Sequence, residues 1–289
     1  MSDLINLYDL APAQLERTLG EVVSPAFRAR QVAEWLHRGV DSFDVMTNLP
    51  KDVRTTLAER FTVAQPEVLT RTEPASDGSV KYLFLLADGN RIESVFMPIG
   101  DRTSICLSSQ AGCAVGCTFC VTGFFGAGRN LTPAEMLGQF FTIQREQQIP
   151  MEQMNVVFMG MGEPLLNFDH LVTTLDVLYT NIAPRPVTVS TSGILPGIEE
   201  LAKLERRPNL AICVNAPDDT LHLLDMYREN IEHPWSIPDD IHAAVDLEGG
   251  RDRGRIWRLT PPNFKPPKPP RLGDASTVEL VATLENPNS

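Results

Sequence analysis

The sequence predicts an α/β fold in which a partial barrel of parallel β/α units follows a small helical domain and precedes an irregular, proline-rich tail. From residue 103 to about residue 221, short apolar runs alternate with segments of helical length, as in parallel β/α units. Residues 1–65 carry helical patterns. Residues 261–270 contain six prolines, which neither a helix nor a strand interior tolerates.

Local signals place the elements that come before the β/α region. Ser24-Pro25 is expected to begin a helix over residues 27–37, with the serine as N-cap and the proline as first helical residue. Two strand-forming runs, 82–86 and 92–97, flank Asp88-Gly89-Asn90, a turn sequence that predicts a β-hairpin.

The β/α region itself is expected to carry the functional site, because parallel barrels place their sites at the carboxyl ends of the strands. Thr132-Pro133-Ala134-Glu135 is a capping box that predicts a helix to about Gln147. The other expected strands and helices are, in chain order, residues 104–107, 155–159, 171–179, 187–190, 196–204 and 210–214.

Composition excludes several classes of protein. The 289 residues contain no apolar run of the roughly 18–20 residues that a membrane span needs, and the first residues lack a signal-peptide pattern. We therefore expect a cytoplasmic protein without a membrane partner. The net charge of -12 argues by itself against a nucleic-acid partner. Five cysteines in such a chain favour metal binding or catalysis over disulfides.

Three of the cysteines lie on one glycine-bearing loop directly after an expected strand. Cys113, Cys117 and Cys120 have the spacing CxxxCxxC, which lets three thiolates surround one compact inorganic centre. A tetrahedral zinc site would need a fourth protein ligand. A [4Fe–4S] cluster normally has four cysteine ligands, so three would leave one iron open to a small molecule. A zinc knuckle and unligated core thiols are the alternatives.

Phe119, before the third cysteine, makes this loop resemble the CxxxCxΦC signature of radical S-adenosylmethionine (SAM) enzymes. Three later segments, read in order, resemble the GEP segment and the next two strand ends of the RlmN/Cfr family of dual-specificity RNA methyltransferases. These are residues 159–167 (MGMGEPLLN), 187–193 (VTVSTSG) and 210–217 (LAICVNAP). Residues 27–31 with Trp35, 46–51 and 92–95 resemble the same family, so the likeness covers residues 1 to about 221.

The resemblance implies methylation of C2 of an adenine in 23S rRNA and in tRNA, with a [4Fe–4S] cluster and SAM as cofactors and a flavodoxin-like or equivalent reductant as electron donor. That carbon lies between two ring nitrogens and is too electron-poor to attack a methyl sulfonium, so a radical route is needed. The implied iron ligands are Cys113, Cys117 and Cys120. The implied cofactor contacts are Gly162, Glu163, Ser190, Cys213, Val214 and Asn215, where Cys213 replaces the usual serine.

Two further residues match catalytic positions of the family. Cys106 matches the resolving cysteine, and a buried strand thiol is the alternative. Glu93 matches the proton acceptor, and an exposed hairpin carboxylate is the alternative. A basic face could offset the acidic net charge toward RNA, although a solvated helix face explains the same residues. Its members are Arg28, Arg30, His37, Arg38, Lys51 and Arg54. We expect a monomer.

The sequence also departs from the family. The family's methyl-carrying cysteine has no counterpart, because Cys213 is the only cysteine after Cys120. The tail resembles the end of the β-propeller part of haem-associated dehydrogenases, in residues 225–229, 231–235, 252–259 and 275–288. A junction near residues 220–225 would divide the chain into an accessory RNA-binding domain with hairpin (1–98), a partial radical SAM barrel (99–221) and an unrelated tail (222–289). Gene fusion, a frameshift or an assembly error could each create it.

Three functions remain open from the sequence. The first is an RNA methyltransferase, impaired by the missing carboxyl-terminal part. The second is a radical enzyme with another substrate, against which residues 1–98 argue. The third is an inactive truncated or fused fragment that only binds a [4Fe–4S] cluster and SAM.

Overall fold

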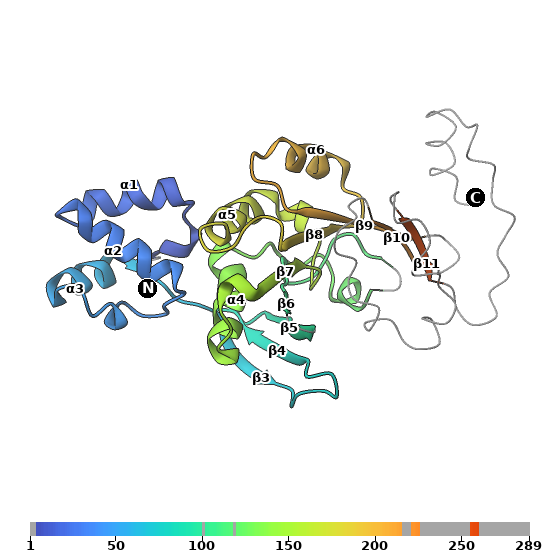
Figure 1. Ribbon diagram of the computed structural model, residues 1–289, viewed down its shortest axis with the longest axis horizontal. Coiled ribbons are helices and arrows are strands. Elements are labelled where there is room, and N and C mark those ends of the chain that lie inside the picture. The colour runs from blue at the N-terminus through green and yellow to red at the C-terminus, as the bar shows by residue number, and fades with distance from the viewer. Residues whose placement is uncertain (1–3, 100–101, 118–119, 216–220, 226–254, 260–289) are drawn as a thin grey trace, which may run out of the picture. The chain divides into compact units, whose positions relative to one another are not determined.

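The computed structural model describes residues 4–99, 102–117, 120–215, 221–225 and 255–259 (Figure 1). The chain divides into two compact units, Met1–Leu210 and Ala211–Ser289. No helix among the described residues is long and apolar enough to cross a membrane. Phe119, the run 261–270 and most of the tail segments that carry the dehydrogenase resemblance lie outside the described residues.

The first unit begins with three helices, α1 (Pro12–Val22), α2 (Ala26–His37) and α3 (Lys51–Arg60). A short parallel pair, β1 (Ile5–Asn6) and β2 (Phe61–Thr62), joins the two ends of this segment. The expected start of α2 is wrong by one residue. Pro25, without a side-chain cap, is the N-cap residue and Ala26 begins the helix, because the extended backbone of Pro25 excludes it from the first turn.

The central sheet of this unit has the strand order β8-β7-β6-β5-β4-β3. Its parallel part consists of β6 (Arg102–Cys106), β7 (Met154–Phe158) and β8 (Val187–Thr191). Its antiparallel part adds β3 (Glu67–Arg71), β4 (Val80–Leu85) and β5 (Arg91–Ile99) to the edge of β6. The predicted hairpin around Gly89 is therefore confirmed, and β3 is an additional strand that the sequence did not indicate.

Helices connect the parallel strands as predicted. They are α4 (Pro133–Gln147), α5 (Phe168–Leu178) and, after β8, α6 (Leu195–Lys203). The capping box at Thr132 is present, and α4 ends at the expected Gln147. Figure 1 shows α4 beside α5, and most residues of α4 are buried. Tyr8 packs its ring 5.5 Å from that of Phe141 in α4, which fixes the amino-terminal segment onto this helix.

The second unit contains an antiparallel arrangement with β10 (Leu221–Asp225) between β9 (Asn209–Asn215) and β11 (Arg255–Leu259). The sequence predicts β9 but not the other two strands. Both are short and follow runs of turn-forming residues, 215–220 and 249–254, and the proline-rich run begins two residues after β11. Ile256 and Trp257 nevertheless have side chains that favour strands.

Candidate functional site

The segments that follow β6 and β7 contact each other directly through their backbones. Ser109 N–H donates to Met161 O at 2.8 Å, and Gly160 N–H donates to Leu107 O at 3.0 Å. A Cβ atom on Gly160 would lie 2.7 Å from the same oxygen, so only glycine permits this approach. The cysteine loop and the segment that carries Glu163 are thus joined where they leave the sheet.

Residues 110–111 pair with residues 129–130 at the base of the cysteine loop, and we call this paired base the neck of the loop. Gln110 and Asn130 form an antiparallel bridge, and Ala111 N–H donates to Arg129 O at 2.9 Å. Gly128 has φ +57, and a Cβ atom there would lie 1.7 Å from Ala111 O. The neck therefore depends on a glycine at 128, and the three cysteines lie in the loop that it closes.

Cys113, Cys117 and Cys120 are all half-buried and form no disulfide. Burial raises the pKa of the Cys117 thiol, and the neighbouring thiols of Cys120 and Cys113 raise it further, with a smaller contribution from Glu163. The loop thus brings the three thiols and the Glu163 carboxylate into one electrostatic neighbourhood. Three sulfur donors on one closed loop fit the ligand chemistry of an iron–sulfur cluster. Within the described ranges, however, no three His, Cys, Asp or Glu side chains form a ready-made metal site.

Glu163 is a buried carboxylate held by neutral donors. It is only 4% exposed, and its Oε2 atom accepts hydrogen bonds from Ser192 N–H at 2.8 Å and from the Ser192 hydroxyl at 2.9 Å. Its Oε1 atom accepts from Leu165 N–H at 3.1 Å. In the part of the chain that the structure describes, no basic side chain pairs with it. A buried carboxylate without a cationic partner favours a ligand that brings a positive charge.

Gly162 and Gln110 set the backbone of this residue. Gln110 Oε1 accepts from Glu163 N–H at 2.8 Å. A Cβ atom on Gly162, which has φ +98, would lie 2.5 Å from the Gln110 side chain. Gly162 is therefore required for the close contact between the two loops, a role that the sequence analysis did not foresee beside its predicted contact with the cofactor.

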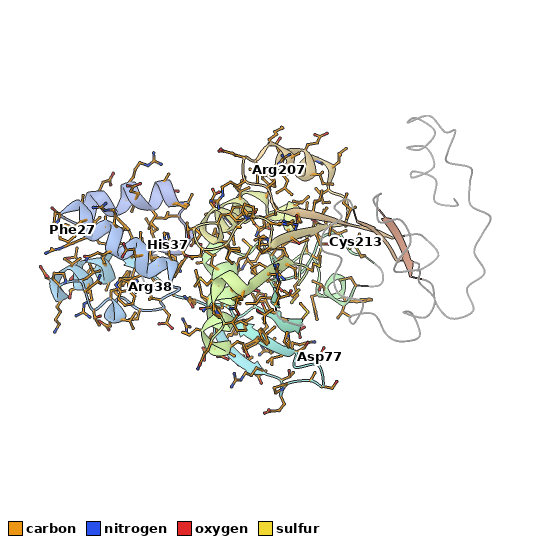
Figure 2. All side chains as sticks on the ribbon, in the orientation of Figure 1. Phe27, His37, Arg38, Asp77, Arg207 and Cys213 are labelled. Carbon is orange, nitrogen blue, oxygen red and sulfur yellow. The ribbon has the colours of Figure 1, made fainter. Side chains whose placement is uncertain are left out.

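The remaining predicted cofactor contacts are placed by their strands. Ser190 is half-buried in β8, two residues before Ser192, which binds Glu163. Cys213, Val214 and Asn215 lie in β9, and they belong to the second unit. Figure 2 marks Cys213 on that strand. Their contact with a cofactor stays a prediction.

Glu93 and Cys106 lie on neighbouring strands. Cys106 ends β6, where it is half-buried between Val95 of β5 and Val157 of β7. Glu93 lies two residues before Val95, with its side chain 47% exposed and Oε2 3.4 Å from Lys81 Nζ. The carboxylate is thus both exposed and ion-paired, and its role as proton acceptor stays a prediction.

The sequence analysis missed a buried polar cluster behind these strand ends. Gln139 of α4 is fully buried, and its Oε1 atom accepts from the Ser94 hydroxyl at 2.5 Å and from Ser108 N–H at 2.9 Å. Its Nε2 atom donates to Ser108 O at 3.1 Å and to Glu135 O at 3.0 Å. One signal was available, because Gln139 interrupts an otherwise apolar run, residues 136–141, with an amide that must find partners.

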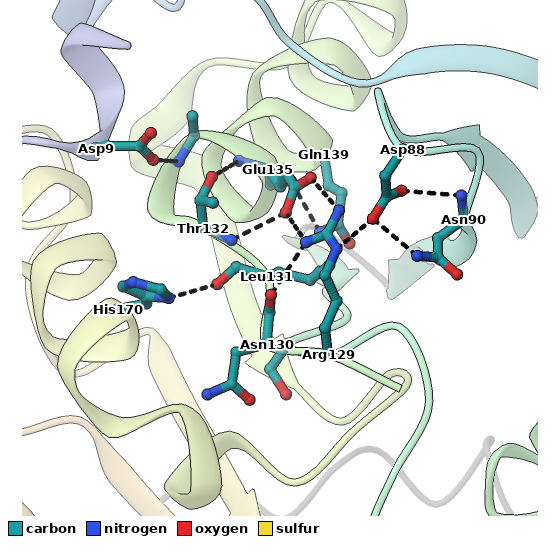
Figure 3. A network of polar contacts seen from close by, with 12 residues as sticks. Asp9, Asp88, Asn90, Arg129, Asn130, Leu131, Thr132, Glu135, Gln139 and His170 are labelled. Atoms are coloured by element: carbon teal, nitrogen blue, oxygen red, sulfur yellow. Dashed lines mark hydrogen bonds and ion pairs between the residues drawn. The ribbon is translucent and has the colours of Figure 1, made fainter. Parts of the chain in front are cut away.

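A second missed residue, Arg129, connects the neck of the cysteine loop to the hairpin turn and to α4 (Figure 3). Its Nη1 and Nη2 atoms each lie 2.7 Å from an oxygen of Glu135, and its Nε atom donates to Asp88. The guanidinium holds the pKa of the Asp88 carboxyl well below its usual range. Asp9 Oδ1 accepts from Ala134 N–H at 2.8 Å and so caps the same helix end.

The predicted basic face is only partly available to a ligand. Arg30, Arg38 and Lys51 are exposed, and the Arg38 guanidinium lies 5.1 Å from the Trp35 ring. The other three members serve the fold instead. Arg28 is half-buried, and its Nη1 atom donates to Ser24 O at 3.1 Å. Arg54 Nη1 donates to Asp44 O at 2.7 Å, and His37 is half-buried, with a pKa lowered by that burial.

Comparisons with known proteins show which family this chain resembles. Residues 5–63 match the family model "Ribosomal RNA large subunit methyltransferase N-terminal domain". Residues 207–263 match a domain of unknown function, DUF7133, and the expected resemblance to β-propeller dehydrogenases is not borne out. A dual-specificity RNA methyltransferase RlmN from Marinobacter nauticus is 42% identical over 279 residues, which cover 87% of this chain and 74% of that protein.

Other relatives extend further than this chain. The RlmN of Campylobacter curvus is 42% identical over 75% of this chain and 62% of its own length. A probable RlmN of Thermus thermophilus is 44% identical over 71% of this chain and 59% of its own length. The chain thus spans about three fifths of these two relatives. The crystal structure of a radical SAM methyltransferase from Sphaerobacter thermophilus is 39% identical, with a TM-score of 0.69, and the match covers 74% of this chain and 64% of that one.

Proposed function

Because the chain belongs to the RlmN family of radical SAM methyltransferases, we propose that it is a radical SAM RNA methyltransferase whose reaction, on C2 of adenosine in 23S rRNA and in tRNA, is impaired in these 289 residues. The observation that carries the proposal is the pairing of two features at adjoining strand ends. One is the closed loop with three half-buried thiols, and the other is the buried carboxylate of Glu163 beside it, held by neutral donors. Thiolates are the ligands of iron–sulfur clusters, and a carboxylate can bind the cationic amino group of SAM, so the pair suits both.

The residues of the site would each have a distinct role in cofactor binding. Cys113, Cys117 and Cys120 would bind the irons of a [4Fe–4S] cluster. Glu163 would bind the amino group of SAM, and Ser192 would hold the Glu163 carboxylate in place. When bound, the cluster and SAM supply radical chemistry that the side chains alone cannot perform.

Further cofactor contacts would come from Gly162, Ser190, Cys213, Val214 and Asn215. Glu93 would accept a proton from the substrate carbon. Cys106 would occupy the resolving position, where release of the product requires disulfide formation with a second sulfur that carries the methyl group.

Binding of RNA would use the exposed part of the basic face, Arg30, Arg38 and Lys51. Phosphate contacts of this kind set the register of an RNA without reading its sequence. We further propose a monomer that acts in the cytoplasm with a flavodoxin-like reductant. Its RNA-binding domain would span residues 1–98, its barrel residues 99–221 and its tail residues 222–289.

The test is anaerobic reconstitution with iron and sulfide, followed by electron paramagnetic resonance (EPR) of the reduced protein with and without SAM. We expect about four irons and four sulfides per chain, a spectrum that changes on addition of SAM, and release of 5′-deoxyadenosine. Cys117→Ala should lose the cluster, whereas Cys106→Ala, which removes a thiol outside the loop, should keep it. Zinc as the only bound metal, or a spectrum insensitive to SAM, would refute the proposal.

One observation favours a second candidate function, a polypeptide that binds a cluster and SAM without transferring a methyl group. The sequence has five cysteines, and after three are assigned to iron and Cys106 to product release, only Cys213 remains. Cys213 lies within β9, paired opposite Leu223 of β10, where its backbone is fixed by the strand. The two candidates differ in one measurement, the formation of 2-methyladenosine in RNA.

A further inference from the structure

Ser108 lies at the point where three strand ends meet, two residues after Cys106 and five before Cys113. Its hydroxyl donates to the backbone oxygen of Glu93 at 2.5 Å and accepts from Met161 N–H at 2.8 Å. A single fully buried hydroxyl therefore bonds to the backbone of the strand that carries Glu93 and to the loop that carries Glu163.

Gln139 holds Ser108 from the other side. Its amide bonds to both backbone groups of Ser108, N–H at 2.9 Å and O at 3.1 Å, so that the serine backbone cannot rotate freely. The Ser94 hydroxyl donates to the same amide oxygen, which ties β5 to the cluster a second time. We call Ser94, Ser108 and Gln139 the Ser108 cluster.

The stability of the fold does not by itself explain this cluster. Buried polar groups can be replaced, as a set, by apolar groups of the same shape with little loss of stability. A fully satisfied buried network instead fixes one arrangement of the groups around it. What the Ser108 cluster fixes is the relative position of the backbones at residues 93, 108 and 161.

We propose that Ser108 and Gln139 are positioning residues, which hold the Met161–Gly162–Glu163 segment where its carboxylate can receive the amino group of SAM. This inference rests on the proposed function for the identity of the ligand. The positioning itself concerns only the chain's own residues, and it can be measured without a cofactor.

The experiment compares Ser108→Ala with Thr174→Val by hydrogen exchange of the backbone amides. Thr174 is a matched control, because it is also a fully buried hydroxyl but bonds to His170 O in its own helix α5 and to Met136 Sδ in α4, and neither partner belongs to the loops of the site. Both variants should lose similar thermal stability. Only Ser108→Ala should lower the protection of the Met161 amide, by about tenfold, because that amide loses its acceptor.

Binding of SAM to the reconstituted protein is the second readout. Ser108→Ala should raise the dissociation constant for SAM by about tenfold with unchanged iron content, and Thr174→Val should leave it within about twofold of the wild type. Gln139→Met should reproduce the effect, which covers the case in which Ser108→Ala does not fold.

Each outcome of these two measurements supports or overturns the proposal. Wild-type protection at Met161 in Ser108→Ala, or an equal loss in Thr174→Val, overturns the positioning role. Lost protection with an unchanged SAM constant overturns the link to SAM. If the wild type does not bind SAM at all, the proposed function fails, and the exchange data still decide the positioning role.

Discussion

Replacement of Arg129 by glutamine should destabilise the first unit by about 2 kcal/mol, because it removes the cation that joins three segments. The two 2.7 Å bonds to Glu135 form a bidentate pair whose carboxylate side chain is only 16% exposed. Hydrogen bonds to charged groups of this kind contribute about 1.5–3 kcal/mol. Asp88 is 38% exposed, so its pair with Arg129 adds less than about 1 kcal/mol after solvent screening.

The pH dependence provides an independent check. The pKa of Asp88 in the folded protein lies below its unfolded value of about 3.9, so the pair stabilises the fold above that value. Its contribution is lost as the pH falls through the folded pKa. The stability difference between wild type and Arg129→Gln should therefore be constant from about pH 5 to pH 8 and should shrink below about pH 4.

Urea denaturation of wild type, Arg129→Gln, Arg129→Lys and Lys203→Gln would measure these differences. Arg129→Lys should recover only part of the loss, since a lysine cannot make the bidentate contact. Lys203→Gln breaks an exposed ion pair with Glu200 and should leave the stability unchanged. A loss below about 0.5 kcal/mol for Arg129→Gln, or a difference that persists unchanged in acid, would refute the role assigned to Arg129.

The site and the basic face can be tested in three further ways. Glu163→Gln should keep the iron content of the reconstituted protein but raise the dissociation constant for SAM at least tenfold, measured by titration calorimetry, because the buried negative charge is lost. The double variant Arg30→Gln, Lys51→Gln should reduce the salt slope of RNA binding by about 0.7 for each phosphate that is no longer neutralised, and an unchanged slope would exclude these residues. The 289-residue chain, incubated with labelled SAM and an adenine-containing RNA, should release far more 5′-deoxyadenosine than it forms 2-methyladenosine, as mass spectrometry would show. Label in that nucleoside would mean that Cys213 or another group carries the methyl, and its complete absence would favour the second candidate function.

The sequence predicts best those features whose causes are local. The capping box at Thr132 and the chain up to Gln147 contain every signal for α4, and its bounds agree with the structure. The hairpin around Gly89 is equally local, since its turn is determined by three adjacent residues. The predicted start of α2 is wrong because serine and proline are both common at helix starts, and only the backbone shows that Pro25 rather than Ser24 is the N-cap residue.

Features that depend on distant partners were not predictable in the same way. Gln139 bonds to Ser94 and Ser108, which are 45 and 31 residues away, and no pattern near Gln139 indicates either partner. The same holds for Arg129, whose bond to Asp88 spans 41 residues. The motifs predict the cysteines and Glu163 as site residues, but the residues that hold their loops in place are visible only in three dimensions.

Those supporting contacts explain why the two loops of the site act as one. From Leu107 to Ala111 the backbone bonds in turn to Val157 in β7, to Met161 in the segment after β7 and to Arg129 in the neck of the cysteine loop. At Gly160 and Gly162 no side chain separates the loops. The position of Glu163 relative to the cysteine loop is therefore set by the backbone and by the buried amides of Gln110 and Gln139. Exposed residues of the loop such as Phe124 and Phe125 do not contribute to it, so sequence can vary at the outer part of the loop while the distance between thiols and carboxylate is kept.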